Sequence, residues 1–142
     1  MAPHGDAMTV EAIMSRRVVT VEFDDRLALV KEIFDATGFR HVLVVENEKL
    51  YGVVSDRDLL RALSPYIGSA TECSRDTDTL NKRVHQVMSR KPITLHANDE
   101  ISGAIKLLLD NRISCIPIVD DDFKPIGIVS LRDILQWFSE KL

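Results

Sequence analysis

Residues 52–60 read GVVSDRDLL, and residues 127–135 read GIVSLRDIL. A glycine, a β-branched pair, a serine, a variable residue, an arginine, an aspartate and two aliphatic residues recur in the same register. An internal repeat of this kind indicates two copies of one structural unit. The two copies of the motif therefore decide the fold, and their polar residues are the first candidates for function.

The repeat extends well beyond the motif. Residues 10–17, VEAIMSRR, match residues 84–91, VHQVMSRK, and the apolar run VLVV at 42–45 matches IPIV at 116–119. The register slips by one residue in the turn before the glycine, a change that a hairpin loop absorbs. The matches predict four regions, which are an N-terminal tail at 1–9, a first repeat at 10–63, a connector at 64–83 and a second repeat at 84–142.

Composition excludes several classes of function. The net charge is −4 and no long run carries one sign, so non-specific nucleic-acid binding has no electrostatic basis. Cys73 and Cys115 are far apart and form no metal-ligand pair, so no metal site is expected. No signal-like segment or apolar run of membrane-spanning length occurs, which favours a cytoplasmic protein without membrane insertion. No nucleophile elbow, pair of catalytic carboxylates or Walker-type loop is present, which favours a binding module over an enzyme.

Each repeat is expected to run strand, helix, strand, strand, helix, an α+β arrangement. In the first copy, Asp25 is the candidate N-cap of a helix that ends at Gly38, and Ser55 caps a helix that ends near Leu63. The expected strands are 18–21, 42–45 and 50–54.

The second copy repeats this order, with short helices expected before each copy at 10–14 and 80–88. Asp99 and Ser130 are its candidate N-caps, and the expected strands are 92–95, 116–119 and 125–129. Pro117 lacks a backbone donor, so its strand is expected to be an edge there or to open towards a cleft. Gly52 and Gly127 permit close approach of a ligand or of neighbouring backbone, or form a hairpin bend.

The doubled motif, the Thr-containing strands and the apolar strands before an acidic turn resemble a tandem pair of CBS domains, named after cystathionine β-synthase. The resemblance covers nearly the whole chain outside the tail and the connector. It implies a Bateman-type regulatory module of the stand-alone bacterial type. In such modules two pseudo-symmetric βαββα repeats pack sheet to sheet and leave two clefts that bind adenosine nucleotides. The modules commonly form homodimers.

Ser55 with Asp58, and Ser130 with Asp133, have the spacing of a helix capping box. A carboxylate held at a helix start can also accept the hydroxyls of a ribose, as the acidic residue of dinucleotide-binding folds does. The resemblance implies this ribose role for both aspartates, with the serine hydroxyls nearby.

Four basic residues are candidates for phosphate binding. Arg57 and Arg132 precede the two aspartates, and guanidinium binds phosphate in a forked geometry. The alternative is that each is a solvated helix-surface arginine. The resemblance implies phosphate contacts for Arg40 and His41 in the first repeat, whereas the second repeat has Ser114 and Cys115 there. The two clefts are therefore expected to differ in phosphate chemistry.

A further set of residues would line the adenine, with ordinary β-propensity as the alternative explanation. They are Val18, Val19, Thr20, Val42, Ile93, Thr94, Ile116 and Pro117, and Leu43 accompanies Val42 in the first repeat.

The leading hypothesis is a module that binds AMP, ADP or ATP in one or both clefts and modulates an unknown partner protein. The nucleotide acts as a regulatory ligand, and no catalytic cofactor is expected. A constitutive dimerisation scaffold with empty clefts is the first alternative. An S-adenosylmethionine binder, which needs no phosphate site, is the second.

Overall fold

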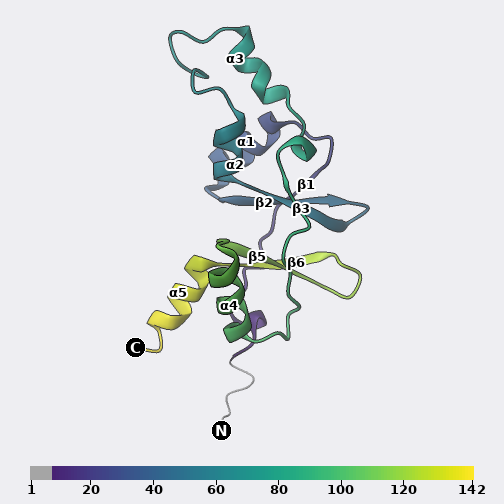
Figure 1. The fold of residues 1–142 in the computed structure, drawn as a ribbon, viewed down its shortest axis with the longest axis vertical. Helices are drawn as coiled ribbons and strands as arrows, with labels where there is room; N and C mark the ends of the chain where they lie inside the picture. The colour runs from purple at the N-terminus through teal and green to yellow at the C-terminus, as the bar shows by residue number, and fades with distance from the viewer. Residues whose placement is uncertain (1–7) are drawn as a thin grey trace. The chain divides into compact units, whose positions relative to one another are not determined.

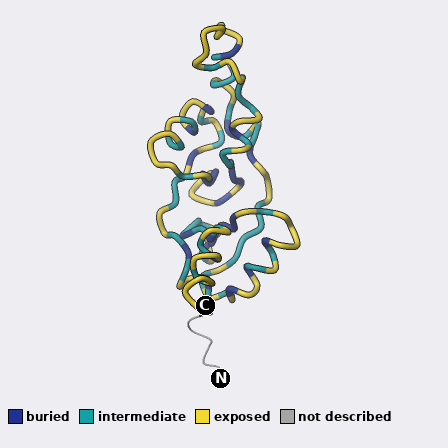
Figure 2. The backbone as a smooth tube through the Cα atoms, turned by 90° about the vertical axis from the view of Figure 1, so that its left-hand side faces the viewer, coloured by how far each residue is buried: buried dark blue, intermediate teal, exposed yellow. Residues whose placement is uncertain are grey.

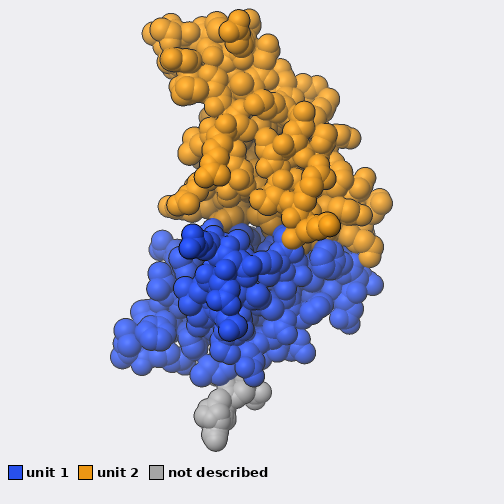
Figure 3. All heavy atoms as spheres, viewed as in Figure 1, with its two compact units in different colours: residues 1–18, 92–142 blue, residues 19–91 orange. Residues whose placement is uncertain are grey.

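The computed structural model describes residues 8–142, which divide into two compact units (Figure 3). Unit 2 is the continuous stretch 19–91, whereas unit 1 joins the N-terminal segment up to Val18 to residues 92–142. Each unit thus contains the short segment that begins the other copy of the repeat. Residues 84–91 of the second copy lie in unit 2, and residues 10–18 of the first copy lie in unit 1. Most of the expected tail, residues 1–7, lies outside the described residues.

Unit 2 contains the first hairpin, two longer helices and the connector (Figure 1). Its elements are β1 (Thr20–Glu22), α1 (Leu27–Thr37), β2 (His41–Glu46), β3 (Lys49–Ser55), α2 (Asp56–Ala62), α3 (Ser74–Asp78), η3 (Thr79–Asn81), η4 (Val84–Gln86) and β4 (Ser89–Arg90).

Unit 1 contains the second hairpin between two helices. Its elements are η2 (Val10–Ala12), α4 (Ile101–Asn111), β5 (Cys115–Val119), β6 (Pro125–Ser130) and α5 (Leu131–Ser139). The expected short helices before each repeat are single 3-10 turns, η2 and η4, rather than longer helices.

One proline accounts for the difference between the two sheets beside β2 and β5. Unit 2 has a four-stranded sheet in the order β1-β2-β3-β4, with β1 parallel to β2. There the Leu43 N–H donates to the Val19 carbonyl at 3.0 Å. Pro117 occupies the matching position in unit 1 and has no N–H to donate. The expected strand 92–95 is consequently wrong, because only an isolated bridge between Leu95 and Ile118 forms beside β5.

The helix boundaries confirm three of the expected caps and correct two. Ser55 and Ser130 cap α2 and α5, and Gly38 ends α1 in the left-handed conformation with φ 74°. The expectation that Asp25 and Asp99 are N-caps is wrong. Their carboxylates instead accept the backbone N–H groups of Glu22 and His96, both at 2.7 Å, and close the turn before each helix.

The connector is held by a buried carboxylate. Asp76 is 8% exposed and accepts the Ser64 hydroxyl at 2.7 Å and the Cys73 N–H at 2.9 Å. The Ser64 bond first, and the Cys73 N–H second, hold the pKa of Asp76 below its ordinary value. Residues 64–79 therefore form an ordered turn, which composition alone did not indicate.

Each unit has its own aliphatic core, visible as the dark blue segments of Figure 2. The core of unit 2 consists of Val21, Leu27, Val30, Val42, Val44, Val54, Leu59, Val84 and Met88. The core of unit 1 consists of Val10, Met14, Ile101, Ala104, Leu108, Ile116, Ile118, Val129 and Ile134. The valine and methionine of each exchanged segment lie in these cores.

Gly52 and Gly127 are required by close packing against the exchanged segments. A Cβ atom on Gly52 would lie 2.7 Å from the Ser89 carbonyl oxygen and 2.8 Å from the Met88 sulfur. A Cβ atom on Gly127 would lie 2.6 Å from the Met14 sulfur. Among the three expectations for these glycines, the structure thus selects close approach of neighbouring backbone.

We expect Gly52→Ala to destabilise the protein by about 1–3 kcal/mol, because the added methyl group overpacks a site bounded by backbone. Gly103→Ala is the matched control, since no atom lies within 4 Å of its Cβ position on α4. That substitution should stabilise by up to about 1 kcal/mol through helix propensity. Urea denaturation of both variants measures the difference, and equal stabilities would contradict the packing argument.

Candidate functional site

Each unit presents the same strand-to-helix junction. In unit 2 the Ser55 N–H donates to Asp58 Oδ2 at 2.9 Å, and the Asp58 N–H donates to Ser55 Oγ at 3.1 Å. In unit 1 the corresponding distances between Ser130 and Asp133 are 2.7 and 3.2 Å. The capping boxes predicted from the spacing are therefore confirmed in both units.

The capping bonds leave part of each carboxylate available. They use Oδ2 of Asp58 and of Asp133, and within residues 8–142 no hydrogen bond to Oδ1 of either group is present. Both residues are only partly buried. A carboxylate accepts about four hydrogen bonds in total. Each junction can therefore accept further donors, such as ligand hydroxyl groups, without breaking its cap.

The Arg40–His41 pair lies beside the junction in unit 2. His41 opposes Ser55 in the β2–β3 ladder, and the Asp56 N–H donates to the Arg40 carbonyl at 2.9 Å. Burial lowers the pKa of His41 below its ordinary value of 6.5, the carboxylates of Asp56 and Asp58 oppose that shift, and Arg40 reinforces it. The charge of the candidate ribose carboxylate therefore acts on the imidazole of His41.

Unit 1 has the same backbone geometry without the Arg40–His41 pair. Cys115 opposes Ser130 in the β5–β6 ladder, and the Leu131 N–H donates to the Ser114 carbonyl at 2.9 Å. A serine and a buried cysteine thus occupy the positions of Arg40 and His41. The frameworks are equivalent, but only unit 2 can offer positive charge from this pair.

Arg57 and Arg132 are exposed on the first turns of α2 and α5. Each directly precedes its aspartate, and successive side chains on a helix diverge by about 100°. Arg57 therefore does not share a helix face with Asp58. The residue that does share it is Arg61, three positions further along α2, which the sequence motif did not single out.

The candidate adenine-lining residues are divided between the two cores and more exposed positions. Val42 and Ile116 are fully buried core members. Thr20 is exposed on β1, where it pairs with Leu43. Outside the hairpins, Val18, Val19, Ile93 and Thr94 are partly buried, whereas Pro117 is buried in β5.

The backbone carbonyls of the candidate adenine-lining residues Val19 and Ile93 differ in their hydrogen bonding. The Val19 carbonyl already accepts the Leu43 N–H. Pro117 has no such donor, so the Ile93 carbonyl is not engaged in the same way.

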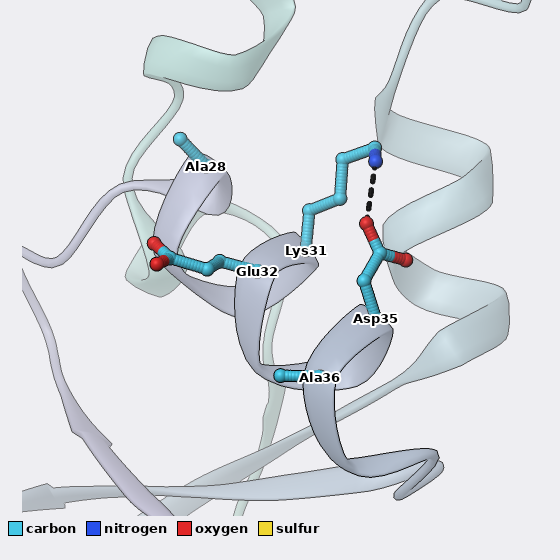
Figure 4. Close-up of a pocket in the computed structure, with 5 residues that line it drawn as sticks. All are labelled: Ala28, Lys31, Glu32, Asp35 and Ala36. Carbon is cyan, nitrogen blue, oxygen red and sulfur yellow. Dashed lines mark hydrogen bonds and ion pairs between the residues drawn. The ribbon is translucent and has the colours of Figure 1, made fainter.

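Two hollows lie on the surface of unit 2. One, of about 440 Å³, lies along the outer face of α1 and is lined by Ala28, Lys31, Glu32, Asp35 and Ala36 (Figure 4). Its lysine and aspartate pair at 2.7 Å with i,i+4 spacing, and none of the predicted site residues lines it. It is a solvated helix face.

The second hollow, of about 280 Å³, does include a predicted site residue. Its lining residues are Asp58, Arg61, Ala62, Lys82 and Val87. Arg61 and Lys82 were missed in the sequence because one lies beyond the repeated motif and the other lies in the connector.

No cluster of three or more histidine, cysteine, aspartate or glutamate residues suited to a metal ion occurs between residues 8 and 142. Across the same residues, every helix is too short or too polar to cross a bilayer.

Comparison with known proteins identifies the doubled unit. The family model for the CBS domain matches residues 10–65 and 84–140. The CBS domain-containing protein DDB_G0289609 of Dictyostelium discoideum is 28% identical over 128 residues, which cover 89% of this chain and 88% of that protein. MJ1225 of Methanocaldococcus jannaschii is 24% identical over 131 residues, covering 92% of this chain. The chain spans only 47% of MJ1225.

Solved structures show the same fold. CBSX2 in complex with AMP has a TM-score of 0.77 and 24% identity, covering 94% of this chain and 98% of that one. The CBS domain pair of MJ0100, in complex with 5′-methylthioadenosine and S-adenosyl-L-methionine, has a TM-score of 0.79 and 23% identity, with 94% and 98% covered. The cytosolic domain of the Mg²⁺ channel MgtE with ATP has a TM-score of 0.74 and 20% identity, with 92% and 49% covered. The expected α+β fold is confirmed.

We expect the lowered pKa of His41 to make folding sensitive to mild acid. The unfolded state binds this proton more readily, so the stabilising contribution is complete above 6.5 and is lost as the pH falls through the folded-state pKa. Denaturant midpoints between about pH 8 and about pH 5, above most carboxylate titrations, should fall less in His41→Gln than in the unchanged protein. An identical slope in both proteins would contradict the assignment.

Proposed function

The chain belongs to the CBS domain family, and on this basis we propose that it is a regulatory module that binds AMP, ADP or ATP and modulates a partner protein. The carrying observation is the recurrence of one junction in both units, in which a capping aspartate keeps an oxygen available for further donors. The adenosine compounds bound by CBSX2, MgtE and MJ0100 support this ligand class. Binding and transmission, rather than catalysis, are the proposed activity.

In this proposal Asp58 and Asp133 accept the ribose hydroxyls, and Ser55 and Ser130 hold the carboxylates in place. A fixed carboxylate at a helix start is suited to this role, because its orientation is set before the ligand arrives. The partner would respond only to the extent that the nucleotide binds two conformations of the module with different affinity.

The proposed phosphate contacts fall unequally on the two units. Arg40 and His41 lie beside Asp58, while Arg57 and Arg132 supply exposed charge near each junction. Unit 2 therefore suits a phosphorylated nucleotide. The cation-poor junction of unit 1 better suits an adenosyl ligand without phosphate, which keeps an S-adenosylmethionine-like ligand as the second candidate.

The proposed adenine contacts come from both repeats. Those of the first repeat are Val18, Val19, Thr20 and Val42, and those of the second repeat are Ile93, Thr94, Ile116 and Pro117. Since Val42 and Ile116 are fully buried in the cores, a contact from either passes through its backbone.

Isothermal titration with AMP, ADP, ATP, S-adenosylmethionine and adenosine tests the proposal. We expect Asp58→Asn and Asp133→Asn to weaken binding at their own junctions by about tenfold or more, the scale of a charge-assisted hydrogen bond. Asparagine retains an acceptor for the cap, so folding should be preserved. Asp56→Asn, in the same helical turn as Asp58, is the control and should bind normally.

Absence of both heat and thermal shift with every adenosine compound would overturn the nucleotide proposal. A partner complex that nevertheless forms, and that survives in the double variant Asp58→Asn with Asp133→Asn, would favour the alternative of a constitutive scaffold.

We also propose that the protein forms a homodimer through leucines at equivalent positions of the repeat. Leu60 on α2 is 74% exposed and Leu135 on α5 is 62% exposed, although both are large apolar side chains. Exposed apolar groups that recur at one position of a repeat are suited to a symmetric contact.

We expect the double substitution Leu60→Glu with Leu135→Glu to convert the dimer to a monomer in sedimentation velocity experiments. Leu109→Glu on α4 is the control, because Leu109 is 70% exposed but its repeat counterpart is Asp35. A monomeric unchanged protein at high concentration, or equal dissociation by the control, would contradict this interface.

A further inference from the structure

The 280 Å³ hollow beside Asp58 is lined by one carboxylate, that of Asp58, and by two cations, Arg61 and Lys82. Asp58 and Arg61 lie three residues apart on α2 and therefore share a face. Lys82 donates from Nζ to the Ala62 carbonyl at 2.9 Å, which fixes its ammonium group at the C-terminal end of the same helix. Asp58 and Ala62 are separated by about 6 Å along the helix axis.

Both cations keep donors for a ligand. Among residues 8–142, no carboxylate lies within ion-pair distance of Arg61 or Lys82. An ammonium group has three donors, of which the Ala62 carbonyl takes one, and a guanidinium group has five. The Lys82 ammonium group already donates to the Ala62 carbonyl, so its charge offsets part of the negative potential at the C-terminal end of α2. Repulsion of an anion by the helix dipole is therefore weaker here.

The other repeat has different residues at the positions that line this hollow. Gln136 and Trp137 stand where Arg61 and Ala62 stand in unit 2, and Met8 matches Lys82 in the repeat alignment. The indole of Trp137 packs against the core of unit 1 together with Ile13, the counterpart of Val87. The small side chain of Ala62 and both cations, which line the hollow in unit 2, are thus absent from the equivalent positions of unit 1.

We propose that this hollow binds a phosphate group through Arg61 and Lys82, and that the phosphate belongs to the nucleotide whose ribose is held by Asp58. In this inference Arg61 and Lys82, rather than Arg40 and His41, hold that phosphate in unit 2. The second part of this inference rests on the proposed function. The arrangement orients the ligand, because the carboxylate accepts hydroxyl donors and repels phosphate, whereas the guanidinium fork and the ammonium group attract it.

Titration of adenosine, AMP, ATP and inorganic phosphate against three variants tests the inference. Arg61→Gln and Ala62→Trp each copy a residue of unit 1, and Arg75→Gln is the control, with the same charge change on an exposed position of α3. We expect Arg61→Gln to weaken AMP and ATP binding by about tenfold while leaving adenosine binding unchanged. Ala62→Trp should have the same effect by filling the hollow, and the control should behave like the unchanged protein.

The two sources of phosphate are separated by the ligands. In one outcome adenosine and AMP both fail to bind, but inorganic phosphate shifts the amide resonances of residues 58–62 and 82 in the unchanged protein and not in Arg61→Gln. The hollow is then a site for free phosphate, and the proposed nucleotide function is wrong. The inference is overturned if AMP, ATP and inorganic phosphate bind Arg61→Gln as tightly as they bind the unchanged protein. It is also overturned if none of these three ligands binds either protein. Should Ala62→Trp fail to fold by circular dichroism, Arg61→Gln alone decides.

Discussion

Both units depend on the packing of a methionine and the backbone that follows it against a glycine in the hairpin. Met88 and the Ser89 carbonyl lie on Gly52, and Met14 with Ser15 lies on Gly127. Reciprocal hydrogen bonds of 2.8 and 2.9 Å between Ser15 and Ile128 fasten one of these segments to its strand. The glycine removes the side chain that would otherwise hold the two backbones apart. The contact therefore covers the hairpin and buries a methionine in the core at the same time.

This contact makes the two copies of the repeat interdependent. The segment that covers each hairpin comes from the other copy, so residues 10–63 alone lack Val84 and Met88, which complete their core. An isolated repeat of this size would bury a smaller fraction of its surface than the paired chain does. Closing unit 1 also requires residues near 14 to meet residues near 127, a long-range contact whose loop entropy is recovered only when the core forms. The chain is consequently built to fold as a pair rather than as two independent copies.

The sequence predicted those helix ends that are determined by hydrogen bonds between residues close together in the chain. The caps at Ser55 and Ser130 follow from a serine and an aspartate three residues apart, which close their own hydrogen bonds. Asp25 was misassigned because an aspartate near a helix start can equally close the preceding turn, and only the backbone path distinguishes the two. The exchange of segments between repeats was not predictable, since both copies carry the same sequence pattern. Lys82 was missed for a related reason, because its place beside α2 depends on the fold of the connector.

The repeat supplies two equal frameworks, and single substitutions make their chemistry unequal. Pro117 in place of Leu43 removes one ladder donor and reduces a strand to a single bridge. Cys115 stands in place of His41 and removes an imidazole from unit 1, and Gln136 in place of Arg61 removes a cation. None of these changes disturbs the capping geometry, because the cap uses only the serine, the aspartate and their own backbone. Because the cap does not depend on neighbouring side chains, it can be kept in both copies while the groups around it diverge. One fold can in this way hold two sites of different ligand preference.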